Sequence, residues 1–577
     1  MTPSPTLSSP DPAMHEPPAP SSVGRHLPLA IVTAAVAVVA LVVRAVIVLN
    51  SGGLSGMVGY DQGVYYSASE AVTWGLLPYR DFLFLHPPGI LVALAPLGLV
   101  ARLTRDSLGL ELARVLVVLV GAANAALVAV AARRLGLFAA AVAGTFYALW
   151  PPVAMAESQP RLEPFVSLGL LVALAVLASR SDRVPRAALV LAGCALGFSV
   201  TVKIWAVVPV LVILVAVLVR LGPRALARVA APLVATATLI CLPFFAAAPS
   251  AMFRMVVRDQ LVRGRMTRPL HARLADMLGL AAHVGQRSGL HEPLTPVLAV
   301  VGIGLVLVWV GLPVARLAVV LLLAQAAVLL ATPSFFAFYA AYLGPAFALC
   351  VGAGAVAVAR LPYPHRARER WRGLGVPHTT GALVALLTVA VLATVARTDA
   401  FTRVGSAFPV ATLRGAVAHA RCVTTDSVGS LALLDVLGRN FSHGCPAVID
   451  LSGLTHDRDA SLLPDGMQAP RRTDLRWQHD VNAYLRSGQV EVLVRRHYDG
   501  FDSSINRWLH RSPVLAGTGG YRVYGHPRRS GPGTGRGSVT GASHTKPQPR
   551  TTASHESQAA VLSSVRRAGR PSSSTAA

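Results

Sequence analysis

The stretch Leu27–Leu49, LPLAIVTAAVAVVALVVRAVIVL, decides the class of fold, because Arg44 is its only charged residue. A helix that crosses a bilayer needs about 20 predominantly apolar residues, whereas the apolar core of a signal peptide has about 7–15. We therefore predict that this stretch is a first membrane span retained as an anchor. Residues 1–25, rich in Pro and Ser, are predicted to form a disordered cytoplasmic tail.

The rest of the chain has the same character. Of its 577 residues, 53% are apolar and 14% are charged, whereas soluble globular proteins have about 45–50% and about 25%. This composition argues against a soluble enzyme. Uncharged runs centred near residues 38, 120, 145, 171, 195, 212, 239, 303, 325, 349 and 388 predict an α-helical polytopic membrane protein with about eleven spans.

The basic residues predict the orientation. The formal net charge is +25, and cytoplasmic loops of membrane proteins are enriched in Lys and Arg. The clusters are Arg133 and Arg134; Arg180, Arg183 and Arg186; Arg220, Arg224 and Arg228; and Arg360, Arg366, Arg368, Arg370 and Arg372. If all are cytoplasmic, the N-terminus is inside a bacterial plasma membrane and the C-terminus is outside. With aromatic residues at only 6%, this charge does not indicate nucleic-acid binding.

This orientation divides the chain into a membrane region, residues 26–397, and an outer part. The segment from about 50 to 107 is then an outer loop, and its apolar stretch Gly89–Leu103 is short for a span, so we predict an interfacial helix. Residues 398–525 are predicted to form a small extracytoplasmic α/β domain. Its expected strands are Cys422–Thr425, Ala447–Asp450, Val490–Val494 and Tyr521–Tyr524.

Two cysteines, Cys422 and Cys445, lie in this outer domain, and an oxidising compartment allows them to pair. Residues 526–577, rich in Ser, Gly, Pro and Arg, are predicted to be a disordered basic tail.

The first outer loop contains the densest group of chemically active residues. It reads Gly59-Tyr-Asp61-Gln-Gly-Val-Tyr65-Tyr66, then Leu77-Pro-Tyr79-Arg80-Asp81-Phe82, then His86-Pro-Pro-Gly89. Each polar residue also has an ordinary structural interpretation. Asp61 is a possible N-cap for a helix over Gln62–Trp74, Arg80 and Asp81 can form a local ion pair, and His86 can simply precede the prolines that start the next helix.

The combination nevertheless resembles the first outer loop of the GT-C glycosyltransferases, in particular the protein O-mannosyltransferase-like and aminoarabinose-transferase-like members. Their pattern is an acidic residue with Gly and Tyr nearby, then Gly-x-x-Pro-Tyr-x-Asp, then His-x-Pro-Pro. The matching segments are Asp61-Gln-Gly-Val-Tyr65, Gly75-Leu-Leu-Pro-Tyr79-Arg80-Asp81 and His86-Pro-Pro. The resemblance implies that Asp61 is the catalytic base.

Weaker matches follow along the chain. The resemblance makes Glu163 the second acidic residue, Lys203 the end of a Gly…Thr-Lys segment, and Tyr339 the aromatic residue before a late span. The alternatives stay open: Glu163 as a surface charge beside Arg161, Lys203 as a side chain that snorkels to the interface, and Tyr339 as an interfacial aromatic anchor.

A metal is not predicted. The first outer loop has no Asp-x-Asp motif of the kind found in metal-dependent oligosaccharyltransferases. An Asp-x-Asp motif does occur at Asp457-Arg458-Asp459, but this segment is in the predicted outer domain, and we interpret the match as chance. The sequence therefore predicts neither a metal nor another cofactor.

The resemblance implies a polyprenyl-phosphate sugar as donor and an extracytoplasmic hydroxyl of a protein, glycan or lipid as acceptor, with inversion at the sugar. Several basic residues lie in the predicted outer loop 249–293, against the usual inside bias. We interpret Arg258 and Arg263 there, with Arg80, Lys203 and Tyr339, as candidate ligands of the donor phosphate among the membrane lipids. Two alternatives are a transporter or flippase and a non-catalytic scaffold for the outer domain.

Overall fold

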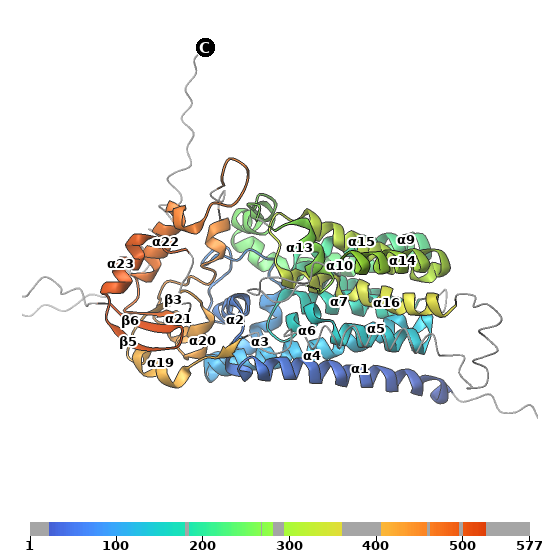
Figure 1. Ribbon diagram of the computed structural model, residues 1–577, viewed down its shortest axis with the longest axis horizontal. Coiled ribbons are helices and arrows are strands. Elements are labelled where there is room, and N and C mark those ends of the chain that lie inside the picture. Colours follow the sequence, from blue (N-terminus) through green and yellow to red (C-terminus); the bar gives the residue numbers. More distant parts are fainter. Residues whose placement is uncertain are drawn as a thin grey trace, which may run out of the picture.

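Long apolar helices run roughly alongside one another and form one end of the protein in the computed structural model, while strands and short helices form the other end (Figure 1). The structure describes residues 22–178, 184–266, 268–280, 294–360, 405–457, 462–494 and 500–526. The apolar helices of the first end are α1 (Ser22–Asn50), α4 (Asp106–Ala132), α5 (Leu137–Leu149), α7 (Leu162–Leu177), α8 (Arg186–Val202), α9 (Val207–Leu221), α10 (Pro223–Ala247), α14 (Leu294–Gly311), α15 (Arg316–Ala331) and α16 (Gly344–Ala359).

These helices confirm a polytopic helical membrane protein. Every predicted span centre from residue 38 to residue 349 falls inside one of them. Within the described ranges, seven helices are long and apolar enough to cross a membrane, while α3 (Gly89–Leu103), α5, α7 and α8 are apolar but shorter. Large apolar side chains such as Val300, Ile303 and Val306 are more than half exposed on α14, as expected for a face that contacts lipid tails.

Some sequence predictions lie outside the described residues. These are the span near residue 388, Arg180 and Arg183, the cluster Arg366–Arg372, Arg458 and Asp459, the C-terminal tail from residue 527 and most of the N-terminal tail. Helix α1 already begins at Ser22, a few residues before the predicted start of the membrane region. The total of about eleven spans therefore stays a prediction.

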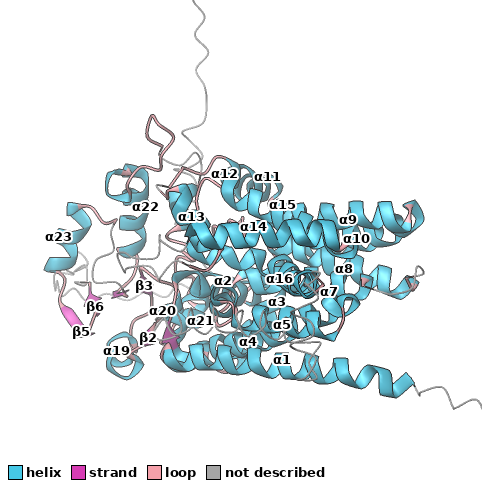
Figure 2. Cartoon of the chain, turned by 45° about the vertical axis from the view of Figure 1, so that its right-hand side comes forward, coloured by secondary structure: helices cyan, strands magenta, loops and turns pink. Residues whose placement is uncertain are grey.

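The first outer loop folds into two helices that lie between the membrane helices and the outer domain (Figures 1 and 2). These are α2 (Tyr60–Thr73) and α3, whose bounds match the predicted interfacial segment. The two helices touch closely, because a Cβ at Gly98 of α3 would lie 2.8 Å from the Cα of Glu70 in α2. Gly89, at the start of α3, packs equally closely against Thr201 at the end of α8.

The outer domain contains a four-stranded sheet in the order β3-β4-β6-β5. Its strands are β3 (Val423–Thr425), β4 (Val490–Leu493), β5 (Val514–Thr518) and β6 (Tyr521–Gly525), and its helices are α19 (Val410–Val417), α20 (Gly429–Leu433), α21 (Leu437–Ser442), α22 (Leu475–Leu485) and α23 (Ser503–Arg511). Strands β3 and β4 are parallel, and the other two pairs are antiparallel. A separate core around Trp477 and Val481 holds α22 and α23 to this sheet.

Two strand assignments differ from the sequence analysis. The expected strand Ala447–Asp450 is not a strand, because this segment leads into a turn in which the Asp450 carboxylate accepts a hydrogen bond from the Gly453 backbone. Strand β5 was missed, since it is a largely exposed strand at the sheet edge with the mixed sequence VLAGT. Such an edge strand lacks the apolar alternation that marks a half-buried one.

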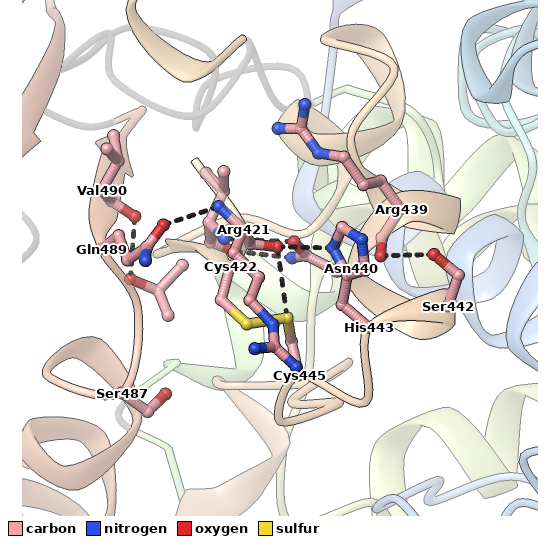
Figure 3. The surroundings of a disulfide bond; sticks show 12 residues. Arg421, Cys422, Arg439, Asn440, Ser442, His443, Cys445, Ser487, Gln489 and Val490 are labelled. Carbon is pink, nitrogen blue, oxygen red and sulfur yellow. Dashed lines mark hydrogen bonds between the residues drawn. A yellow bond between two sulfur atoms is a disulfide. The ribbon is translucent and has the colours of Figure 1, made fainter. Parts of the chain in front are cut away.

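A disulfide joins Cys422, just before β3, to Cys445, just after α21 (Figure 3). The two Cα atoms are 5.7 Å apart. The side chain of Asn440 binds both the backbone N–H and the carbonyl of Val423 beside this bridge. Together these contacts fix α21 against the first strand of the sheet, and α21 also contacts the first outer loop.

The outer domain docks on α2 through two glycines. A Cβ at Gly63 of α2 would lie 2.6 Å from the backbone nitrogen of Gly429 in α20. A short antiparallel pair, β1 (Gly56–Met57) with β2 (Ser406–Ala407), reinforces this joint. Because both contacts involve backbone atoms, the outer domain is held at a fixed position over the first outer loop.

Replacing Gly63 with alanine is therefore expected to destabilise the protein by about 1–3 kcal/mol, since the new methyl group must push the two backbones apart. The change is measured as a lower melting temperature in detergent. Gly415→Ala is the matched control, because Gly415 is also in a helix and has open space around it. A loss of equal size in both variants would contradict the proposed role of the joint.

A buried pair of carboxyl groups lies at the same joint. Glu70 of α2 is fully buried, and Asp106 at the start of α4 is 6% exposed and accepts a hydrogen bond from the Gly438 backbone in α21. Burial, with the negative charge of Asp106 as a further cause, raises the pKa of Glu70 well above its usual 4.5. The folded protein therefore retains a proton on Glu70 at pH values where the unfolded chain has lost it.

A raised carboxyl pKa means that stability falls as the pH rises from about 4.5 through the folded-state pKa. Glu70→Gln keeps the shape of the neutral acid without a proton to lose. We expect this variant to exceed the wild type in stability by at least about 1 kcal/mol at pH 8, and the difference to shrink toward pH 5. Thermal unfolding at both pH values measures this, and an unchanged pH dependence would refute it.

Candidate active site

A buried ion pair lies where α7 begins and α8 ends, near the first outer loop. Glu163 is in the first turn of α7, and Lys203 follows the last residue of α8. The Lys203 Nζ donates a hydrogen bond of 2.7 Å to Glu163 Oε1, and both side chains are only 4% exposed. Buried charges of this kind persist only when they are paired, so each of these two residues requires the other.

Asp61 lies beside this pair and is more accessible. It is in the first turn of α2, and its Oδ2 is 3.4 Å from Nη1 of Arg161, the residue that precedes α7. The Asp61 side chain is 31% exposed, against 10% for Arg161. Gly59 permits this approach, because a Cβ there would lie 3.3 Å from Arg161 Nη2. Asp61 is thus a partly open carboxylate at the edge of a buried charged cluster.

Aromatic rings surround the cationic side chains. The Lys203 Nζ lies 4.1 Å from the ring centroid of Trp205 and 4.3 Å from that of Tyr339. The guanidinium of Arg161 lies 3.9 Å over the ring of Phe338. Cations over ring faces at these distances are stabilised by the ring quadrupole. The aromatic residues Phe338 and Tyr339, which precede α16, therefore form one wall of the cluster.

The remaining first-loop residues support this region from one side. The Tyr65 hydroxyl is 3.3 Å from His86 Nε2, and the Tyr79 hydroxyl donates to the His86 carbonyl. Tyr79 has a positive φ of 68°, a conformation that non-glycine residues rarely adopt. Arg80 points elsewhere: its guanidinium binds Asp81, and its side chain is 51% exposed.

The basic outer loop crosses over the same region. Its backbone pairs with the outer domain, because Arg265 N donates to the Gly466 carbonyl and its carbonyl accepts from Gln468 N. Its Gln260 side chain donates to the Leu85 carbonyl in the first outer loop. Arg263 is half-buried there, whereas Arg258 is exposed. The loop is thus fixed to both the outer domain and the first outer loop, and Arg263 contributes positive charge to the site.

The electrostatics of the site suit a base at Asp61. Desolvation raises the pKa of Asp61 above its usual 3.8, and the positive charge of Arg161 partly opposes this shift. Desolvation, with the charges of Lys203 and Arg263, lowers the pKa of His86 well below its usual value. His86 is therefore neutral near pH 7, while Asp61 accepts a proton more readily than an exposed aspartate.

The outer domain adds residues that the sequence analysis did not identify. The Tyr60 hydroxyl donates a hydrogen bond of 3.1 Å to Asp450 Oδ1 and accepts one from the Ser452 backbone N–H. Desolvation raises the pKa of Asp450; the Gly453 backbone N–H opposes this shift, and the negative charge of Asp61 adds to it. Asp450 thus faces the same region as Asp61, and no local pattern could have placed it there.

A second buried network lies deeper, among the membrane helices. Arg44 of α1 donates from Nε to Glu157 Oε2 at 2.9 Å, and the other oxygen of Glu157 accepts from Asn124 of α4 and Tyr147 of α5. Arg44 and Glu157 have relative exposures of 0% and 1%. Glu157 precedes the segment with Arg161 and Glu163, so this network anchors one wall of the site.

Several structural alternatives from the sequence analysis are wrong. Asp61 is not an N-cap, because α2 begins at Tyr60 with Gly59 as its cap residue. Glu163 is not a surface charge, and Lys203 does not snorkel, since they are buried against each other. Tyr339 is 8% exposed and packs against Trp205. Of the predicted phosphate ligands, Lys203, Tyr339 and Arg263 lie near Asp61, while Arg80 binds Asp81.

The site is thus charged and aromatic, and it lies beneath the outer domain at one end of the bundle of apolar helices. Within the described residues no group of three or more His, Cys, Asp or Glu side chains is arranged to hold a metal ion. No protein-family model and no curated protein sequence matches the chain.

Solved structures match the fold. ArnT from Cupriavidus metallidurans bound to undecaprenyl phosphate is similar over 89% of this chain and 100% of its own, with 17% identity and a TM-score of 0.53. The apo state of the same protein is similar over 87% of this chain and 98% of its own, with 16% identity and a TM-score of 0.52. A third match is the archaeal oligosaccharyltransferase AglB from Archaeoglobus fulgidus, in complex with an inhibitory peptide and a dolichol-phosphate. It is similar over 83% of this chain and 70% of its own, with 13% identity and a TM-score of 0.50. The chain therefore shares its overall fold with ArnT and AglB.

Proposed function

We propose that the protein is a membrane glycosyltransferase that transfers a sugar from a polyprenyl-phosphate donor to an acceptor hydroxyl outside the cell, with inversion. The observation that carries this proposal is the partly open Asp61 carboxylate beside the buried Glu163–Lys203 pair at the ends of the apolar helices. An apolar chain can lie along those helices while its phosphate meets the cationic cluster. Undecaprenyl phosphate and dolichol-phosphate, which are bound in the ArnT and AglB structures, have this chemistry.

In the proposed reaction, the acceptor oxygen forms a bond to the anomeric carbon as the bond between that carbon and the phosphate oxygen breaks. Asp61 accepts the proton of the acceptor hydroxyl, and the leaving group is polyprenyl phosphate. One displacement with one base inverts the anomeric centre, whereas a retaining double displacement also needs a nucleophile. Glu163 is not free for that role, since it is buried against Lys203.

Positive charge is needed where the phosphate departs. We assign this role to Arg263 and Lys203, with Tyr339 beside Lys203, because their charges lie near Asp61 in a poorly solvated region. Arg258 and Arg80 are more exposed, so we expect smaller contributions from them. The acceptor is then presented from the side of the outer domain, near Asp450.

The test compares lipid-linked sugars and envelope glycans in cells with and without the gene. Loss of one glycan component together with accumulation of a polyprenyl-phosphate sugar is expected. Unchanged glycans and unchanged lipid-linked sugars would contradict the proposal. Uptake of a substrate into proteoliposomes without formation of a glycosidic bond would instead favour a transporter.

A further inference from the structure

A cavity lies at the membrane end opposite the candidate active site. Its volume is about 130 Å³, close to the ~150 Å³ of apolar cavities that bind small hydrocarbons. It is formed between α4, α7, α9 and α15, and its lining is mostly aliphatic. Six of the lining residues are alanines, at positions 131, 132, 178, 216, 315 and 318. These small side chains leave the space that larger ones would fill.

The cavity is separate from the site around Asp61. Lys203 lies just before α9, and Arg220 is near the end of this helix, which corresponds to a separation of about 20 Å along the helix axis. A second cavity continues toward Pro209 and Gln325, but its volume is only about 10 Å³, which is enough for one water molecule. An occupant of the larger cavity therefore enters from the far end of the bundle.

Two arginines line the cavity at that end. Arg134 is half-buried after the end of α4, and Arg220 is exposed in the last turn of α9. The described segments around this end carry Arg133, Arg186, Arg224, Arg228, Arg316 and Arg360 and contain no Asp or Glu. An apolar cavity with a cationic mouth is complementary to a molecule with an apolar chain and an anionic head.

We infer that this cavity is a binding site for one anionic phospholipid, with part of one acyl chain between α7, α9 and α15 and its phosphate between Arg134 and Arg220. The orientation predicted from the basic loops makes this a lipid of the cytoplasmic leaflet. Such a lipid holds together helices that are loosely packed at this end. This inference does not depend on the proposed transferase activity, because lipid binding is measured without any sugar donor.

The test uses the full chain purified in detergent, with phosphatidylglycerol and phosphatidylcholine as probes, and detects retained lipid by native mass spectrometry and by melting temperature. The wild type is expected to retain one phosphatidylglycerol and to be stabilised by it more than by phosphatidylcholine. Arg134→Gln with Arg220→Gln should weaken phosphatidylglycerol binding roughly 30-fold, from about 1 kcal/mol for each basic residue near the headgroup. Ala318→Phe should displace the lipid by filling the cavity.

Arg224→Gln with Arg228→Gln is the matched control, because it removes the same charge from exposed positions outside the cavity lining. Equal loss of binding in the control pair would show general attraction to a basic surface and would overturn the inference. Equal binding of phosphatidylcholine, or retention of an isoprenoid phosphate in the cavity, would also overturn it. Arg220→Gln alone tests the headgroup contact if the double variant does not fold.

Discussion

Asp61→Asn is expected to lower the rate of sugar transfer by about 10²–10⁴-fold, the usual contribution of a general base. Asparagine has nearly the shape of aspartate and its oxygen can still face Arg161, but it cannot accept the proton of the acceptor hydroxyl. Because Asp61 is already 31% exposed and is not a helix cap, the variant should fold normally. Initial rates with a polyprenyl-phosphate sugar in detergent or liposomes measure the effect.

The pH profile separates a lost base from a general disturbance. The pKa of Asp61 is raised above 3.8, and only the ionised carboxylate acts as a base. Wild-type kcat/KM should therefore fall as the pH is lowered through this raised pKa, and the residual activity of Asp61→Asn should lack this decline. Asp480→Asn, in α22 of the outer domain, is the matched control. Near-normal turnover of Asp61→Asn would refute the assignment.

The helical part of the fold could be predicted because the bilayer imposes a local rule. A span needs about 20 apolar residues, so a run such as Leu27–Leu49 can be recognised from its local sequence without knowing which helices pack against it. The bounds of helix α3 could be predicted for the same reason, since they coincide with an uninterrupted apolar run. Asp61 and Glu163 were selected by their resemblance to a known pattern, and the structure brings them to one site.

The rest of the site could not be predicted because its contacts join distant parts of the chain. Tyr60 binds Asp450, which is 390 residues away, and the backbone around Arg265 pairs with Gly466 and Gln468. No local pattern indicates which loop an outer domain will cover. The strand predicted at Ala447–Asp450 was wrong for the same reason. This β-rich segment leads into a turn that faces the first outer loop, a contact between distant parts of the chain.

Arg44 shows the same limit within the membrane. In the sequence it only interrupts an apolar run, whereas in the structure it binds Glu157, 113 residues away. The fully buried pair is connected to α4 and α5 through Asn124 and Tyr147. Because Glu157 lies just before Arg161 in the chain, we interpret the Arg44–Glu157 pair as a support for the wall of the site and not as a group that contacts the substrate.

Arg44→Met should therefore have the largest effect on stability, about 3–5 kcal/mol, since it leaves the Glu157 carboxylate buried without its counter-charge. Adding Glu157→Gln should recover much of this loss, because glutamine is neutral and its oxygen still accepts from Asn124 and Tyr147. The double variant would then be more stable than Arg44→Met alone in thermal or denaturant unfolding in detergent. If the second change only adds to the loss, the penalty comes from lost packing of the long Arg44 side chain and not from an unpaired charge. Sugar transfer should follow the same order as stability, because displacement of Glu157 also shifts Arg161 and Glu163.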